Sequence, residues 1–199
     1  MIRALLIIDI QNDFLPGGSL AVPNGDEVIE VANQWSAKPE LVIATQDWHP
    51  ADHLSFASQH PHQQVGDIVE LDGLEQVLWP DHCIQGSSGA NFPPDLRTDR
   101  IDTVIRKGCN RRIDSYSGFF DNARKQSTNL ENVLREHGVI AVDILGLATD
   151  YCVLSTALDA VDLGFETRVI LDGIRGVDLQ NGDCVAAITR MRDSGVSFV

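Results

Sequence analysis

Short apolar runs alternate with amphipathic segments along most of the chain. The runs are mainly aliphatic, which is typical of strands buried on both faces of a sheet. Between them, hydrophobic residues recur every three or four positions, which is the spacing of one helical face. The predicted strands are 2–9, 41–45, 103–105, 139–147, 167–171 and 196–199, and the predicted helices are about 26–35, 130–137, 151–163 and 182–193.

Strands that alternate with helices predict a parallel sheet covered by helices on both faces. We therefore expect an α/β fold with three layers, α/β/α, around a central, mostly parallel sheet of about six strands. The chain contains no internal repeat, low-complexity tract or interdomain linker, so we expect one domain over residues 1–199. The order of the strands within the sheet does not follow from this pattern.

The alternating pattern is lost between about residues 48 and 100. Five of the six histidines lie in this stretch, together with most of the prolines. Loops of this length inside compact domains are usually functional or disordered. Because the stretch is rich in His, Trp and Phe, we expect an ordered, metal-bearing excursion over the active face of the sheet rather than a disordered segment.

Composition narrows the functional classes. The content of hydrophobic residues, 43%, and of charged residues, 22%, is ordinary for a globular chain, and no apolar run approaches the roughly 20 residues that span a bilayer. A net charge of -14 argues against nonspecific binding to nucleic acid or to an anionic membrane. The four widely spaced cysteines indicate free thiols in a reducing compartment. We expect a cytoplasmic protein with a small-molecule partner, and the oligomeric state stays open, a homo-oligomer included.

Three predicted strands end beside reactive side chains. Asp9 ends the first strand, Lys107 follows the strand at 103–105, and Cys152 lies where strand 139–147 gives way to a helix. Such ends converge on one crevice, and a helix start favours the thiolate form of a cysteine. An aspartate that accepts the thiol proton and a lysine that keeps the aspartate ionised would make Cys152 a nucleophile. Taken singly, each residue has a structural alternative, as a packed cysteine or a salt bridge.

A second group of residues has the donor types of a metal site. Asp47 and His49 stand two positions apart, on the same side of an extended segment, and His82 lies further along the excursion. Two imidazoles and one carboxylate suit a borderline divalent ion, zinc first, with iron or manganese as alternatives. Three protein ligands would leave positions for water or substrate. The structural alternative is a set of unconnected histidines.

The segments around these residues resemble the signatures of the isochorismatase-like cysteine hydrolases. The resemblance covers nearly the whole chain in order and is carried by Asp9–Phe14, Arg106–Gly108 and Gly146–Val153. It implies a Rossmann-like fold and a catalytic triad of Asp9, Lys107 and Cys152. It also implies a cis peptide bond before Ala148 and an oxyanion hole formed by the backbone N–H groups of Ala148 and Cys152.

The spacing of Asp47, His49 and His82 is similar to that of one branch of this superfamily, the nicotinamidases, whereas many other relatives lack the metal set. This resemblance implies that the metal ion binds the ring nitrogen of the substrate, so that the carboxamide faces the thiol.

The same resemblance implies further residues of the site. Phe14 and Trp79 match positions that wall the ring pocket, with ordinary core packing as the alternative role. His53 is a further candidate ligand, because some relatives use a fourth protein ligand in this region and others use water. The loop Asp114–Phe120 resembles a family loop near the site, without single roles for its residues.

The activity that the resemblance implies is hydrolysis of nicotinamide to nicotinate and ammonia through a thioester, in nicotinamide salvage for NAD, and hydrolysis of pyrazinamide as well. Three alternatives stay open. A metal-activated water would put the chemistry at the metal and make it insensitive to thiol alkylation. A related cysteine hydrolase would act on another ring carboxamide. A zinc-stabilised α/β binding module would leave Asp9 and Lys107 without explanation.

Overall fold

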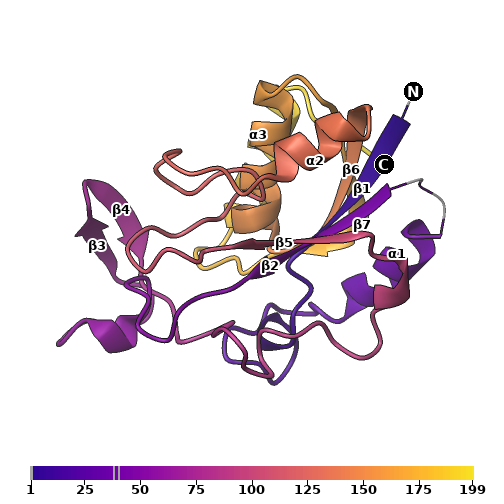
Figure 1. Ribbon diagram of the computed structural model, residues 1–199. Coiled ribbons are helices and arrows are strands. Elements are labelled where there is room, and N and C mark those ends of the chain that lie inside the picture. The colour runs from indigo at the N-terminus through magenta and orange to yellow at the C-terminus, as the bar shows by residue number, and fades with distance from the viewer. Residues whose placement is uncertain (1, 38, 40) are drawn as a thin grey trace.

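The computed structural model describes residues 2–37, 39 and 41–199, and within them the chain forms a six-stranded, entirely parallel sheet (Figure 1). Across the sheet the order is β5-β2-β1-β6-β7-β8. The strands are β1 (Ile2–Ile8), β2 (Leu41–Asp47), β5 (Thr103–Lys107), β6 (Val139–Leu147), β7 (Glu166–Arg175) and β8 (Ser197–Phe198). The α-helices are α1 (Glu27–Trp35), α2 (Leu130–Glu136), α3 (Leu154–Asp162) and α4 (Asp183–Asp193).

Both faces of the sheet are buried, which explains why the central strands are continuously apolar. Along β1, Leu6 and Ile8 pack on one face, whereas Leu5 and Ile7 pack on the other. Helices α2, α3 and α4 cover the first face, and α1 covers the second together with loop residues. Figure 1 shows α2 and α3 on the opposite side of the sheet from α1. The predicted three-layer α/β/α architecture is confirmed. None of the helices in the described part of the chain is long and apolar enough to cross a membrane.

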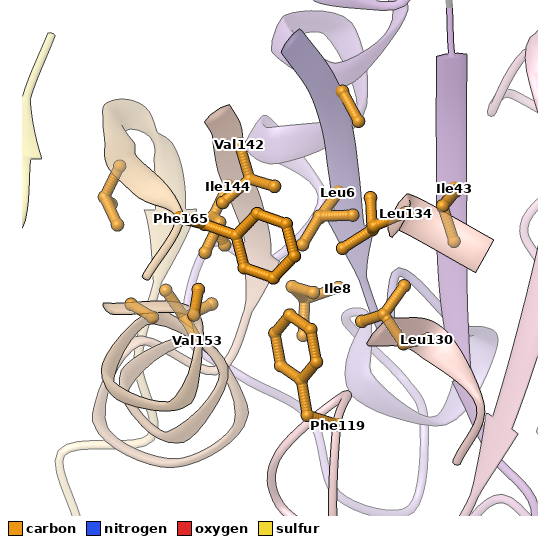
Figure 2. Close-up of a cluster of buried hydrophobic side chains, with 14 of the residues drawn as sticks. Leu6, Ile8, Ile43, Phe119, Leu130, Leu134, Val142, Ile144, Val153 and Phe165 are labelled. Atoms are coloured by element: carbon orange, nitrogen blue, oxygen red, sulfur yellow. The ribbon is translucent and has the colours of Figure 1, made fainter. Parts of the chain in front are cut away.

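The core on the first face is built around two stacked phenylalanine rings. Figure 2 shows Phe119 and Phe165 lying between side chains of the sheet and of the helices. Their ring centroids are 6.1 Å apart. Phe119 comes from the loop that follows β5, so this packing fixes a loop that also reaches the carboxyl ends of the strands.

The strand order creates a crevice between β1 and β6. From β1 the chain builds the sheet outward through β2 and β5, then returns to the other side of β1 with β6 and continues through β7 and β8. Such a reversal opens a crevice at the carboxyl ends of the two central strands, where ligands bind in doubly wound folds. Asp9 directly follows β1, and Cys152 lies in the π-helical turn η4 (Thr149–Val153), which follows β6.

The excursion at 48–100 contains regular structure that the periodicity did not predict. Strands β3 (Ile68–Leu71) and β4 (Leu74–Val77) form an antiparallel hairpin that stands away from the main sheet (Figure 1, left). Its turn is Asp72-Gly73, with φ of 52° and 85°. Asp-Gly at such a turn is a strong hairpin signal, so the sequence did hold the information. Single turns of 3-10 helix, η1 (Asn12–Phe14), η2 (Ala57–Gln59) and η3 (Thr98–Arg100), complete the connections.

Truncation of Leu6 tests the central packing. Leu6 is fully buried, and we expect Leu6→Ala to lower the free energy of unfolding by about 2–5 kcal/mol, because the lost contacts leave a cavity in a close-packed layer. Denaturant unfolding measures the change. Val185 on α4 is 69% exposed, so Val185→Ala is the control and should change stability by less than about 0.5 kcal/mol. Equal losses in the two variants would contradict this view of the core.

Candidate active site and metal centre

Asp9, Lys107 and Cys152 meet at the carboxyl ends of three different strands. Lys107 Nζ lies 2.8 Å from Asp9 Oδ2 and 3.4 Å from Cys152 Sγ, and all three side chains are buried. The structure therefore brings together the carboxylate, the cation and the thiol that the sequence placed at separate strand ends.

Backbone geometry and a hydroxyl group orient Asp9. Its φ of 47° turns the chain sharply where β1 ends. The Thr45 hydroxyl on β2 donates to Asp9 Oδ1 at 2.6 Å and accepts the Asp9 N–H at 3.1 Å. Burial raises the pKa of Asp9 to about 6 against the opposing charge of Lys107, and the charge of Asp47 adds to the rise. A carboxylate with this pKa is an effective proton acceptor near neutral pH.

The Lys107 ammonium lies between two carboxylates. Besides Asp9, it contacts Asp47 Oδ1 at 2.5 Å and donates to the Ser115 carbonyl oxygen at 2.8 Å. Burial disfavours its charged form, but the two carboxylates outweigh this effect and raise the pKa of Lys107 well above its usual value. Lys107 therefore keeps its positive charge at neutral pH.

The thiol rests in its protonated form. Burial raises the pKa of Cys152 well above the usual value, although the charge of Lys107 acts in the opposite direction. The helix start was expected to favour the thiolate, but burial and the carboxylates of Asp9 and Asp47 outweigh it. Attack by sulfur therefore requires a proton acceptor, and Asp9 is within reach of it, because its carboxylate oxygen and the Cys152 sulfur lie within 4.8 Å.

Asp47, His49 and His82 converge beside this cluster. Asp47 Oδ2 lies 3.8 Å from His49 Nε2 and 3.9 Å from His82 Nε2, and all three side chains are buried. Asp47 ends β2, and the His49 N–H donates to the carbonyl oxygen of Cys83, the residue after His82. Because its other oxygen contacts Lys107, the Asp47 carboxylate joins the nitrogen donors to the cluster of Asp9, Lys107 and Cys152.

Backbone carbonyl groups determine which nitrogen of each imidazole faces the centre. His49 Nδ1 lies 2.9 Å from the Gly108 oxygen, and His82 Nδ1 lies 2.8 Å from the Pro80 oxygen. Since a carbonyl oxygen only accepts, Nδ1 carries the proton and the Nε2 lone pair of the neutral ring points toward Asp47. His49 Nε2 is buried without a hydrogen-bond partner. These residues fit a divalent ion, which would satisfy that lone pair.

The charges of the three donors are also suited to a cation. Burial alone would raise the pKa of Asp47, but Lys107 and the two histidines outweigh it and hold the pKa below its usual range. Burial, reinforced by His49, lowers the pKa of His82 to about 4, which keeps this ring neutral. The pKa of His49 is raised despite burial because of Asp47. A cation binding there would displace a proton from His49.

His53 lies beside the three donors with a different orientation. Its ring centroid is 4.5 Å from that of His49, and its Nδ1 accepts the Ser55 N–H at 3.1 Å. Neutral His53 therefore carries its proton on Nε2, which is buried without a partner. A donor atom of His53 lies within 4.8 Å of donor atoms of His49 and Asp114, whereas His53 is not grouped with Asp47 and His82.

A mainly apolar cavity lies between the thiol and the metal donors. Phe14 and Trp79 both line it, and the Phe14 ring centroid is 5.5 Å from that of His82. Trp79 Nε1 donates to the Tyr116 hydroxyl oxygen at 3.2 Å, and its ring meets Tyr151 edge-on at 4.9 Å. The sequence analysis gave no individual role to five residues that complete the lining, namely Leu20, Asp114, Tyr116, Tyr151 and Val177.

The backbone at the end of β6 borders the same cavity. The Leu147–Ala148 peptide bond is cis, as the family resemblance implied. Ala148 and Cys152 both line the cavity. The two residues implied for an oxyanion hole therefore lie together beside the thiol.

Known proteins of one family are similar to this chain over nearly its whole length. The family model of the isochorismatase domain matches residues 3–199. The chain is 50% identical over 200 residues to the nicotinamidase of Escherichia coli (strain K12), which covers 98% of this chain and 93% of that protein.

Two solved structures are also similar. An Acinetobacter baumanii nicotinamidase and pyrazinamidase matches with a TM-score of 0.96 and 47% identity, over 99% of this chain and 95% of that one. A Pyrococcus horikoshii pyrazinamidase in complex with zinc matches with a TM-score of 0.81 and 35% identity, over 100% and 99% of the two chains. Because the family model spans nearly the whole sequence, the chain belongs to the isochorismatase family.

Proposed function

We propose that this chain is a metal-containing cysteine amidohydrolase that converts nicotinamide to nicotinate and ammonia, and that it acts in cytoplasmic nicotinamide salvage for NAD. The observation that carries the proposal is one cavity bordered by both the buried Cys152 thiol and the metal donors Asp47 and His82. The names of the E. coli and A. baumanii relatives support the substrate.

The cavity suits a flat heteroaromatic ring with one reactive substituent. Aromatic faces of Phe14 and Trp79 exclude water from such a ring and orient it. Asp47, His49 and His82 would hold a divalent ion, with zinc supported by the P. horikoshii complex. The ion would supply a Lewis acid that takes up the ring nitrogen of the substrate. His53 is the candidate for a fourth ligand, which would require its proton to move from Nε2 to Nδ1, where Ser55 Oγ at 2.7 Å could accept it.

Thioester formation begins with proton transfer from Cys152 to Asp9. The sulfur attacks the carboxamide carbon while Asp9 takes the thiol proton, so charge moves onto the carbonyl oxygen. The N–H groups of Ala148 and Cys152 would stabilise that oxyanion. When the C–N bond breaks, Asp9 returns the proton to the leaving nitrogen, and ammonia departs from the thioester.

Hydrolysis of the thioester uses the same groups in the same order. Asp9 accepts a proton from an attacking water, the oxyanion forms again, and collapse breaks the C–S bond. Sulfur then takes the proton back from Asp9, which restores the thiol and releases nicotinic acid, and the acid ionises to nicotinate by losing its proton to water. Lys107 keeps Asp9 ionised between the two half-reactions and stabilises negative charge on sulfur.

A different ring carboxamide, pyrazinamide in particular, is the second candidate substrate, and the naming of the A. baumanii and P. horikoshii relatives favours it. Because a ring nitrogen is smaller than the C–H group it replaces, pyrazinamide needs no more room in the cavity than nicotinamide does. We propose that both amides are hydrolysed, and direct competition between them in an ammonia assay measures the preference.

Removal of the thiol tests the nucleophile. We expect Cys152→Ala to reduce ammonia release by more than about a thousandfold, since neither half-reaction can proceed. Zinc content, measured on the same protein, should stay at the native level. Cys109 is exposed, so Cys109→Ser is the matched control and should retain full turnover. Substantial hydrolysis by Cys152→Ala would transfer the chemistry to a metal-activated water.

The pH dependence tests the proton acceptor. Since Asp9 must be ionised to accept the proton, kcat/KM should fall as the pH drops through about 6. Thr45→Val removes the hydroxyl that donates to Asp9 Oδ1. Loss of this bond to the carboxylate should move the acidic limb to higher pH. A profile that is flat down to pH 4 would exclude Asp9 as the base.

Metal removal separates substrate positioning from nucleophile generation. A chelator-treated protein should lose ammonia release by about a hundredfold, because the ring is no longer oriented, and added zinc should restore it. Alkylation of Cys152 by iodoacetamide, followed by peptide mass spectrometry in a Cys109→Ser background, should continue in the metal-free protein. Full turnover after verified metal loss would refute the positioning role.

A further inference from the structure

The metal ligand Asp47 lies at a strand end where one neighbouring strand is missing. β1 pairs with β2 only as far as Ile7 and Ala44, and the positive φ of Asp9 then turns the chain at the end of β1. On its other side, β2 remains paired to its end, where Asp47 lies opposite Lys107. The peptide groups of Asp47 that face β1 therefore need a partner from outside the sheet.

The side chain of Gln11 supplies that partner. Gln11 Oε1 accepts the Asp47 N–H at 2.8 Å, and Gln11 Nε2 donates to the Asp47 carbonyl oxygen at 2.9 Å. The second Nε2 proton goes to the carbonyl oxygen of Ala90, also at 2.9 Å. Since both acceptors are carbonyl groups, the orientation of the amide is fixed. Gln11 is fully buried, and its amide reproduces the donor and acceptor of a missing strand.

We propose that Gln11 is a positioning residue for the metal centre. Holding both peptide groups of Asp47 prevents rotation of the backbone from which the carboxylate projects. The two oxygens of that carboxylate have different partners, because Oδ1 contacts Lys107 and Oδ2 faces the two histidines. A small rotation would move Oδ2 out of the donor set. The inference rests on the metal site of the proposed function and adds a residue that does not itself touch the ion.

A neighbouring glutamine provides a control for the purely structural effect. Gln46 is also buried, at 6% exposure, and its Nε2 donates to the same Ala90 carbonyl oxygen at 3.0 Å. Gln11→Met and Gln46→Met therefore both remove a buried amide and one hydrogen bond to Ala90. Only Gln11→Met also leaves the Asp47 peptide groups without their partner.

The test is the zinc affinity of the full chain, measured by competition with a chromophoric chelator on metal-free protein. We expect Gln11→Met to weaken zinc binding about 10–100-fold, which is the usual effect of removing a residue that hydrogen-bonds to a metal ligand without touching the metal. Gln46→Met should keep a zinc affinity within about threefold of the native value, because the Gln46 amide bonds to Ala90 and not to the metal ligand Asp47. Thermal unfolding of the metal-free forms, run in parallel, should show both variants destabilised. If Gln11→Met does not fold, Gln11→Asn replaces it, because its amide falls one methylene short of Asp47.

Two outcomes would overturn the inference. The first is native zinc affinity in the Gln11 variant, and the second is an equal loss of affinity in the Gln46 variant. Either result would mean that Gln11 has only a general structural role, without contradicting the metal centre. Asp47→Asn serves as the reference that must weaken zinc binding. Native affinity in Asp47→Asn would remove the metal centre itself, and the two failures are thereby distinguished.

Discussion

One buried ammonium group, that of Lys107, joins the two halves of the site. It contacts Asp9, the proposed proton acceptor of the thiol, and Asp47, one of the three proposed metal ligands. Without it, two buried carboxylates would face each other, and at least one would bind a proton and lose its function. Burying a cation is costly unless it is fully paired, and two carboxylates and a backbone carbonyl meet that condition here. Asp9 and Asp47 are thereby held on either side of one cation.

The partners of Lys107 reach it because β1, β2 and β5 end at different positions along the sheet. β1 stops first, which frees Asp9 to turn toward Thr45 and leaves the edge of β2 open for the amide of Gln11. β2 and β5 continue to Asp47 and Lys107, which lie opposite each other. The reversal of strand order at β1 and β6 brings the thiol to the same crevice. The residues of the proposed chemistry and of the proposed metal site therefore lie at the same end of the sheet as a consequence of topology.

Much of this arrangement could be predicted from local sequence. The apolar runs predicted the strands, and because the reactive residues lie at or shortly after the strand ends, their convergence followed from the parallel sheet. The hairpin was missed although Asp72-Gly73 signalled it. The protonated state of the Cys152 thiol could not be predicted from the local sequence, since it depends on burial and on carboxylates from other strands. The same holds for Leu20 and Val177, which line the cavity from loops with no distinguishing pattern.

The central claim is that Cys152 carries the acyl group between two half-reactions. A rapid acid quench of the zinc-loaded Cys109→Ser protein mixed with nicotinamide, followed by peptide mass spectrometry, tests this directly. The account expects a nicotinoyl group on the peptide that contains Cys152, formed as fast as the first equivalent of ammonia appears. Ammonia released at full rate with this peptide unmodified at every quench time, and with turnover that survives Cys152→Ala, would contradict it.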